Sequence, residues 1–222
     1  NLGRVGFLAP VEAPHWEAGL KEVFAGRALL DPRMRLCAQL VSTHGRESRE
    51  LVALNDLVLS RGAAQGLATI HLEVGQQWVS DYRADGLILA TPSGSTAHSL
   101  AAGGPILAPE MGGIVVTPIC AHTLSHRPLV LHPDSEIVLR VSAVTGLVTL
   151  AVDGQGFHPL VQGDSVHVRR HPEPYPLLTR PGLDSWRRLR ERLGWRGSLD
   201  TDPEDEPSRS ESADAPGQGE VL

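Results

Sequence analysis

The sequence predicts a mainly β protein, built as layered antiparallel sheets in the manner of a β-sandwich, with a few short helices. Three observations predict this class: the Val-, Ile- and Leu-rich segments are short, Gly, Pro, Asn and Asp separate them, and long helices do not intervene. The 222 residues, 41% of them hydrophobic, are enough to bury a core. The expected strands are 35–41, 51–59, 68–74, 86–90, 113–117, 136–141, 147–152 and 165–169.

Three helices are expected around this β body. Apolar residues recur at every fourth position within 14–25, which predicts an amphipathic helix there. A second helix should begin at Ser95 and Thr96, whose hydroxyls suit an N-cap, and end before the Gly-Gly-Pro sequence at 103–105. The third is expected over 183–195, where an apolar stripe runs among arginines.

The charge is distributed unevenly. The net charge is −6, but residues 198–222 alone carry −7, so the rest of the chain is close to neutral. The body therefore lacks the basic excess that nucleic-acid binding requires, and no apolar run is long enough to cross a membrane. Cys37 and Cys120 cannot form a disulfide scaffold or a four-cysteine zinc site, which favours a reducing compartment.

The segment 85–99 is the most informative part of the sequence. It predicts a strand, a tight turn and a helix start, and it carries five hydroxyl groups, on Thr91, Ser93, Ser95, Thr96 and Ser99. Free N–H groups at a helix start, with Gly94 allowing close approach, could hold the phosphates or the base of a nucleotide. No Lys follows the glycine, so this is not a Walker loop. A capped helix after a turn explains the same local pattern.

A polar pair, Asn55 and Asp56, interrupts the apolar run 51–59. Polar side chains in a buried strand need hydrogen-bond partners, so the pair indicates either a bulge or turn, or a clamp for a ribose diol. Asp85-Gly86 and Asp153-Gly154 are, taken singly, ordinary turn dipeptides. No metal site is expected, because the spaced histidine pairs lie on a strand or between prolines and have no acid beside them.

Taken together, six motifs in the same order resemble the carboxy-terminal part of the NAD kinase family, over about residues 1–195. The segment 85–97, for example, is similar to the family's Asp-Gly followed by Thr-Pro-Thr-Gly-Ser-Thr-Ala. The other five motifs are Asn-x-Gly-x-x-Gly-Phe-Leu at 1–8, Leu-Asn-Glu at 54–56, Pro-x-x-x-His-x-Leu-x-x-Arg-Pro-Leu at 118–129, Asp-Gly-Gln at 153–155 and Leu-Gly-Trp at 193–195.

The resemblance implies a two-domain kinase in which a domain of layered β-sheets follows an α/β domain. It implies phosphoryl transfer from ATP or polyphosphate, with magnesium, to the 2′-hydroxyl of the adenosine ribose of NAD, giving NADP in the cytoplasm, by a homodimer or homotetramer. Residues 1–30 would then be a remnant of, or connection to, the first domain, and 31–178 the NAD-binding domain. Residues 179–196 would form a helix that packs on the first domain, and 197–222 a disordered acidic tail.

The resemblance also implies roles for nine residues. Asn55 and Asp56 would hold a ribose and the adjoining part of NAD, while Arg83 and Asp85 would reach the dinucleotide at a subunit contact. The remaining five would surround the adenine or lie near the site: Thr96, Ala97, His98, Ser99 and Gln155.

Three departures from the family pattern matter. Asp56 stands for the usual Glu, and His98 stands for the usual Tyr. The third departure is that the sequence contains no Gly-Gly-Asp-Gly loop, whose Asp is the family's proposed base and would precede Asn1. We therefore expect a fragment that is inactive alone. Two alternatives are a non-catalytic nucleotide-binding or assembly module and a relative of lipid or sugar kinases.

Overall fold

The computed structural model describes residues 11, 13–43, 50–61, 67–123, 126–144, 146–179, 189–190 and 193–195. The chain divides into two compact units, one of residues 28–179 and one that joins 1–27 to 180–222. The second unit contains a 3₁₀ turn, η1 (Ala13–His15), and the expected amphipathic helix, α1 (Trp16–Phe24). Most of the helix predicted at 183–195, and the whole acidic tail at 197–222, lie outside the described residues.

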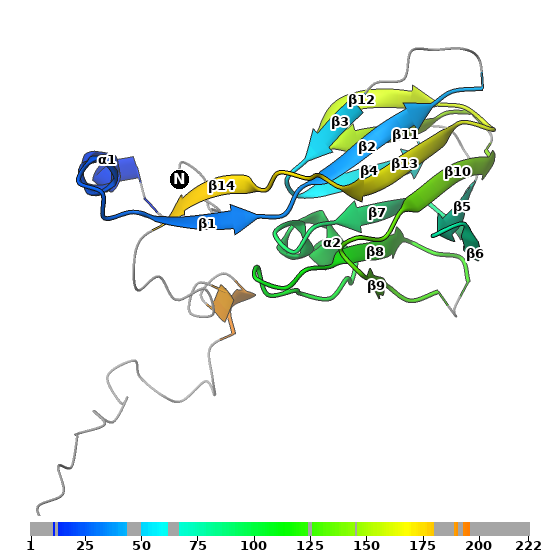
Figure 1. The fold of residues 1–222 in the computed structure, drawn as a ribbon. Coiled ribbons are helices and arrows are strands. Elements are labelled where there is room, and N and C mark those ends of the chain that lie inside the picture. The colour runs from blue at the N-terminus through cyan, green and yellow to red at the C-terminus, as the bar shows by residue number, and fades with distance from the viewer. Residues whose placement is uncertain are drawn as a thin grey trace, which may run out of the picture. The chain divides into compact units, whose positions relative to one another are not determined.

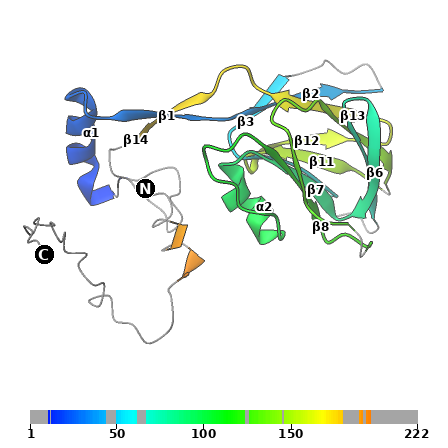
Figure 2. The same cartoon turned by 60° about the horizontal axis from the view of Figure 1, so that its bottom comes forward.

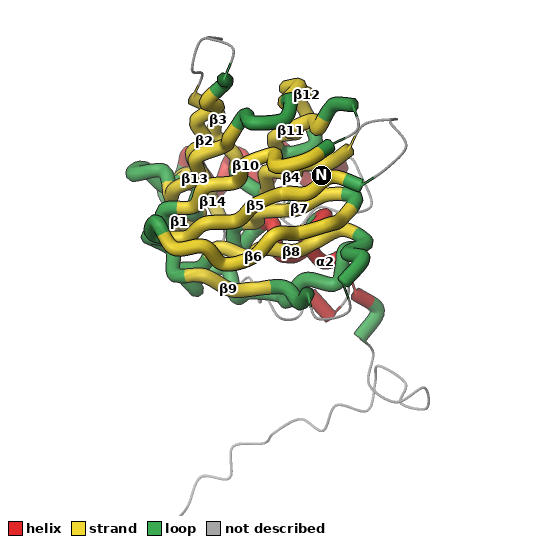
Figure 3. Tube along the Cα trace, turned by 90° about the vertical axis from the view of Figure 1, so that its right-hand side faces the viewer, coloured by secondary structure: helices red, strands yellow, loops and turns green. Residues whose placement is uncertain are grey.

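The unit 28–179 is a β-sandwich, which confirms the predicted fold class and includes the whole of the predicted domain 31–178 (Figures 1 and 3). Sheet I has the strand order β3-β2-β13-β10-β5-β6, sheet II has the order β12-β11-β4-β7-β8-β9, and β1 pairs with β14 in a separate ribbon. Every pair of neighbouring strands is antiparallel. The strands are β1 (Leu29–Arg33), β2 (Leu36–Val41), β3 (Glu50–Ala53), β4 (Asp56–Arg61), β5 (Ala68–Val74), β6 (Gln77–Ala84), β7 (Gly86–Ala90), β8 (Ile114–Ile119), β9 (Leu129–Leu131), β10 (Ile137–Ala143), β11 (Val148–Val152), β12 (Gln155–Leu160), β13 (Ser165–Arg170) and β14 (Tyr175–Thr179).

The main core lies between the two sheets. Alternate residues of facing strands fill it, such as Ile70 and Leu72 of β5 in sheet I and Leu57 and Leu59 of β4 in sheet II. A second apolar cluster lies on the other face of sheet II, where Val58, Ile88 and Val115 pack with Leu107 from the loop before β8. Sheet II is thus buried on both faces in its centre, which explains why β7 and β8 are apolar at almost every position.

Two elements that were predicted to be continuous are each divided into two in the structure. The run 51–59 is not one strand, because the chain leaves sheet I after β3 and enters sheet II with β4, so residues 54–55 form the connection. The helix expected over 95–102 is a single 3₁₀ turn, η2 (Gly94–Thr96), followed by the short helix α2 (His98–Ala101). Figure 2 shows α2 beside β7 and β8.

Five strands were not predicted: β1, β6, β9, β12 and β14. All five are edge or ribbon strands. The residues of β1, β6, β12 and β14 are largely polar or exposed, so their sequences lack a regular apolar pattern, whereas β9 is apolar but only three residues long. The β5–β6 hairpin depends on a two-residue turn in which Gly75 and Gln76 both have positive φ, at 56° and 65°. None of the described helices is long and apolar enough to span a membrane.

Candidate functional site

The connection between the sheets, which carries the predicted polar pair, is held by one carboxylate. The backbone N–H groups of Leu54, Asn55 and Asp56 donate to the Asp153 carboxylate at 2.8, 2.7 and 3.0 Å. The Asp153 N–H in turn donates to the Asp56 carbonyl at 2.9 Å. Asp153 itself sits in a turn with φ of 49°, a left-handed conformation that Asp tolerates better than most residues. The Asp-Gly-Gln turn and the polar pair are therefore one structural unit.

The hydroxyl-rich loop is hydrogen-bonded to the same connection. The Thr91 N–H donates to the Asn55 carbonyl at 2.9 Å, and the Thr91 hydroxyl donates to the Leu54 carbonyl at 2.6 Å. The Gly94 N–H donates to the Thr91 hydroxyl at 3.1 Å, which closes the turn. A Cβ on Gly94 would lie 2.0 Å from the Asn55 carbonyl oxygen, so only glycine fits at this position. Three of the motifs singled out in the sequence thus meet at one end of sheet II.

The hydroxyls of this loop are used mainly within the protein. Ser95 is buried, donates to the Pro92 carbonyl at 2.6 Å and accepts the Leu107 N–H at 3.0 Å. The half-buried Thr96 donates to the Ser93 carbonyl at 3.1 Å. Neither hydroxyl caps a helix, which corrects the expectation for both, because the N-cap of α2 is Ala97 and has no side-chain hydrogen bond.

The three residues that follow differ in exposure. Ala97 and His98 face solvent, whereas Ser99 is fully buried with its oxygen 2.8 Å from the Thr117 hydroxyl. Gln155, directly after the Asp153–Gly154 turn, is exposed at the same end of sheet II. The exposed members of the predicted set can therefore meet a ligand through their side chains, while Ser99 anchors α2 to β8.

Asp56 is the buried charge of this cluster. Only 5% of the surface of Asp56 is exposed, and this burial raises the pKa of its carboxyl. The charge of Asp153 raises that pKa further, while His98 acts in the opposite direction, which places a cation-capable ring near the carboxylate. Such a carboxylate is a strong acceptor for ligand hydroxyl groups once it is ionised.

Arg83 and Asp85 lie elsewhere. Both precede β7 in the chain, at the end of the strand opposite to the hydroxyl-rich loop. The five residues of β7 separate the two ends of that strand by about 13 Å. The Arg61 Nε donates to the Asp85 carboxylate at 2.7 Å, and this hydrogen bond holds the pKa of Asp85 below its usual range. Arg83 is exposed, and its backbone carbonyl accepts a hydrogen bond from the His122 N–H at 3.0 Å. Within one chain, this second cluster is not joined to Asn55 and Asp56.

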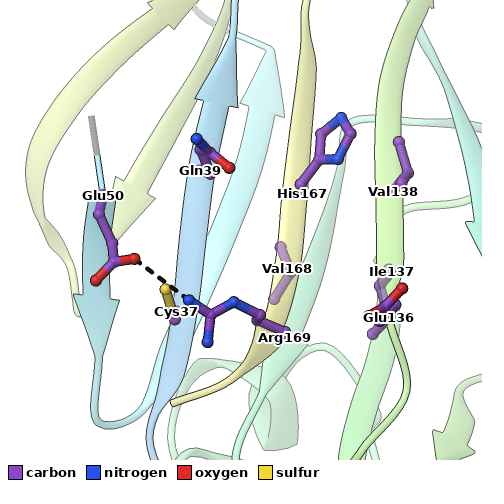
Figure 4. A pocket seen from close by; sticks show the side chains of 9 residues that line it. All are labelled: Cys37, Gln39, Glu50, Glu136, Ile137, Val138, His167, Val168 and Arg169. Atoms are coloured by element: carbon purple, nitrogen blue, oxygen red, sulfur yellow. Dashed lines mark hydrogen bonds and ion pairs between the residues drawn. The ribbon is translucent and has the colours of Figure 1, made fainter. Parts of the chain in front are cut away.

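A cavity of about 240 Å³ lies on sheet I, over β3, β2, β13 and β10 (Figure 4). An ion pair between Arg169 and Glu50, 3.4 Å apart, lies beside the buried Cys37, whose thiol pKa is raised by burial and by its contact with Glu50. A raised pKa leaves less of the reactive thiolate at neutral pH. The residues that line this cavity belong to none of the sequence motifs.

Sequence reasoning missed the central role of two residues. Asp153 was recognised as part of a turn and of a family motif, and Thr91 as one hydroxyl among five in another such motif, but neither was given a role in the site. The Asp-Gly dipeptide was the available signal for Asp153, but its partners lie 97 to 99 positions earlier in the chain.

Comparison with known proteins first gives the class. A family described as "ATP-NAD kinase C-terminal domain" matches residues 54–179, which include the connection, the hydroxyl-rich loop and the Asp-Gly-Gln turn. The class is thus that of the β-rich C-terminal domain of a kinase. The archaeal NAD kinase of Archaeoglobus fulgidus, solved in complex with ATP, shares this fold with a TM-score of 0.69 at 22% identity, covering 89% of this chain and 73% of that one.

Individual relatives give the family. The chain is 42% identical over 193 residues to an NAD kinase of Symbiobacterium thermophilum, covering 87% of this chain and 68% of the relative. It is 38% identical to an NAD kinase of Desulforamulus reducens, with 90% and 69% covered. A yeast NADH kinase solved with NADH has a TM-score of 0.83 at 34% identity, covering 89% of this chain and 58% of that one. This chain belongs to the NAD kinase family.

Proposed function

We propose that this protein transfers a phosphoryl group from ATP, or from polyphosphate, to the 2′-hydroxyl of the adenosine ribose of NAD, giving NADP. One observation carries the proposal: hydrogen bonds from Thr91 and to Asp153 join the polar connection, the hydroxyl-rich loop and the Asp-Gly-Gln turn into one site. Phosphoryl transfer depends mainly on positioning and on stabilising charge, so a rigid platform for the acceptor ribose is what this domain would supply.

Each predicted residue has a place in this proposal. Asn55 and Asp56 would accept hydrogen bonds from ribose hydroxyls, with the carboxylate of Asp56 ionised when the ligand is bound. The residues around the adenine would be Thr96, Ala97, His98 and Ser99, with the His98 ring stacking on the base and Ser99 acting from within the protein. Gln155 would contact the ligand from the exposed start of β12.

Magnesium would enter bound to the phosphates of the donor. Among the described residues there is no group of three His, Cys, Asp or Glu side chains that could hold a metal ion. Both oxygens of Asp153 already accept backbone N–H groups, so this carboxylate is a poor candidate ligand. Magnesium characteristically binds substrate phosphates with only one or two protein carboxylates, so the proposal does not require such a group of protein ligands.

Arg83 and Asp85 would reach NAD from a neighbouring copy of the chain. The whole length of β7, about 13 Å, lies between them and Asn55 within one chain, and a homodimer or homotetramer would bring the two clusters together. The protein would act in the cytoplasm, as the resemblance implies.

The test is an assay of NADP formation from NAD, ATP and Mg²⁺ with a dehydrogenase specific for NADP, on this chain and on the full-length protein. We expect product from the full-length protein and none from the chain alone. The absence of NADP from the full-length protein with either ATP or polyphosphate would refute the kinase proposal. NAD binding without turnover would instead indicate a binding module.

Substitutions connect the activity to the site. Asn55→Ala and Asp85→Ala should each weaken NAD binding in calorimetry, because each removes a hydrogen-bonding group from the proposed contact. Gln162→Ala, in an exposed turn outside both clusters, is the matched control and should bind NAD as the wild type does. Unchanged affinity in both Asn55→Ala and Asp85→Ala would remove these residues from the site.

A further inference from the structure

We infer that Asp153 is a positioning residue for NAD: its carboxylate fixes the backbone of residues 54–56, so that Asn55 and Asp56 present their side chains to the ribose. This inference rests on the proposed function and deepens it. Asp153 does not need to touch the ligand for this role, since it acts through the residues that do.

The geometry of the contact supports this role. A single carboxylate accepts three consecutive backbone N–H groups, with Oδ1 bound to Asn55 at 2.7 Å and to Asp56 at 3.0 Å, and Oδ2 bound to Leu54 at 2.8 Å. Consecutive N–H groups that converge on one anion fix the backbone dihedral angles between them. Charge-assisted hydrogen bonds of this kind are about twice as strong as neutral ones.

The position of the contact explains why such an anchor is needed. Residues 54–55 lie in neither sheet, because β3 ends at Ala53 in sheet I and β4 begins at Asp56 in sheet II. The ladder hydrogen bonds that hold a strand are therefore missing at the point where the ligand-binding side chains start. Asp153 supplies the N–H acceptors there, and Thr91 supplies donors for the carbonyls of Leu54 and Asn55.

The same chain offers a matched control for a purely structural carboxylate. Asp164 is buried, and accepts the N–H groups of Thr43 at 2.9 Å and Val161 at 3.1 Å, as well as the Thr43 hydroxyl at 3.2 Å. It therefore joins two chain segments through backbone N–H groups as Asp153 does, but it lies among none of the proposed NAD-binding residues. Substitution of either residue should cost stability, whereas only Asp153 should affect NAD.

The experiment compares Asp153→Asn with Asp164→Asn in the full-length protein, well below both melting temperatures. Asparagine tolerates the left-handed φ of Asp153 but retains one acceptor oxygen and presents an N–H₂ group to backbone donors. We expect the KM for NAD and the NAD dissociation constant of Asp153→Asn to rise about tenfold or more, with the KM for ATP unchanged. Asp164→Asn should lower the melting temperature and leave the KM for NAD within about twofold.

Amide hydrogen exchange provides a second measurement. The amides of Leu54, Asn55 and Asp56 should exchange faster in Asp153→Asn and at the wild-type rate in Asp164→Asn. If Asp153→Asn does not fold, Asp153→Glu takes its place, since it keeps the charge but moves the carboxylate by one methylene, and it should also raise the KM for NAD.

Each outcome decides the inference. Equal effects of the two Asn variants on NAD, or a normal KM for NAD in Asp153→Asn or in its Glu substitute, would overturn it. A wild type that binds NAD but makes no NADP would refute the kinase proposal, while the dissociation constants and exchange rates would still decide the role of Asp153. A wild type that binds no NAD would overturn both.

Discussion

Gly94 is where a single added methyl group should disrupt the site. In Gly94→Ala the new Cβ would lie 2.0 Å from the Asn55 carbonyl oxygen and 2.4 Å from the carbonyl carbon. Because Cβ contacts under 3.0 Å essentially do not occur, the two backbone segments must separate by about 1 Å. The atoms in contact are backbone atoms, so no flexible side chain can move aside to relieve the clash.

The cost follows from the hydrogen bonds across this contact. Overpacking a well-packed position costs about 1–3 kcal/mol. Separation by this distance also breaks the bonds from Thr91 to Asn55 and Leu54, now 2.9 and 2.6 Å long, at about 1 kcal/mol each. We expect Gly94→Ala to destabilise the fold by about 3–5 kcal/mol, which for a chain of this length lowers the melting temperature by about 6–20 °C.

Thermal unfolding monitored by calorimetry measures this effect, with Gly103→Ala as the control. Gly103 has a positive φ of 84° but nothing within 4 Å of its Cβ position, so its substitution costs only the backbone strain, about 1 kcal/mol. Gly94→Ala should also weaken NAD binding more than Gly103→Ala, because it displaces Asn55. If the two variants melt at the same temperature, the close contact between the loop and the connection does not exist, and the reasoning fails.

Two further predictions concern charge. Asp56→Asn should stabilise the fold at neutral pH by about 1 kcal/mol and weaken NAD binding, because burial raises the folded-state pKa of Asp56 and its ionised form is therefore unfavourable. The stability gain should vanish as the pH falls and the wild-type carboxyl takes up a proton; a destabilised Asp56→Asn at pH 7 would contradict this. Asp85→Asn should have the opposite effect, because the hydrogen bond from Arg61 lowers the folded-state pKa of Asp85. Its contribution is present above about pH 4 and is lost as the pH falls through the folded-state pKa, so urea unfolding across this range should show a flatter acid limb in the variant.

The central strands could be predicted because buried strands are rich in apolar residues, which the sequence shows directly. The bounds of β5 and β7 agree with the predicted segments 68–74 and 86–90, since both strands are buried on one or both faces and are rich in Ile, Leu and Val. The edge strand β6 carries polar residues on its exposed face, and β1 and β14 each contain a proline at an exposed position. Such strands are held by pairing with a neighbour and do not need an apolar pattern of their own.

The break between β3 and β4 could not be predicted from the sequence around it. Both segments are apolar because each contributes to the core from a different sheet, so the run 51–59 has the composition of one continuous buried strand. Asn55 and Asp56 were the only sign of an interruption, and the connection at residues 54–55 lies where a bulge or turn was one of the expectations. The change of sheet itself depends on the strands to which β3 and β4 pair, which lie far away in the sequence.

The hydroxyl-rich loop shows why composition locates a site better than it assigns roles within it. Serine and threonine hydroxyls satisfy backbone carbonyls or bind a ligand with the same chemistry, so a count of hydroxyls cannot separate the two uses. Here the buried Ser95 and Ser99 bond within the protein, and the exposed residues of the same stretch are Ala97 and His98. The residues that shape the loop are thus those with hydroxyls, whereas the residues most open to a ligand are Ala97 and His98, which carry none. Burial, which only the fold determines, makes that division.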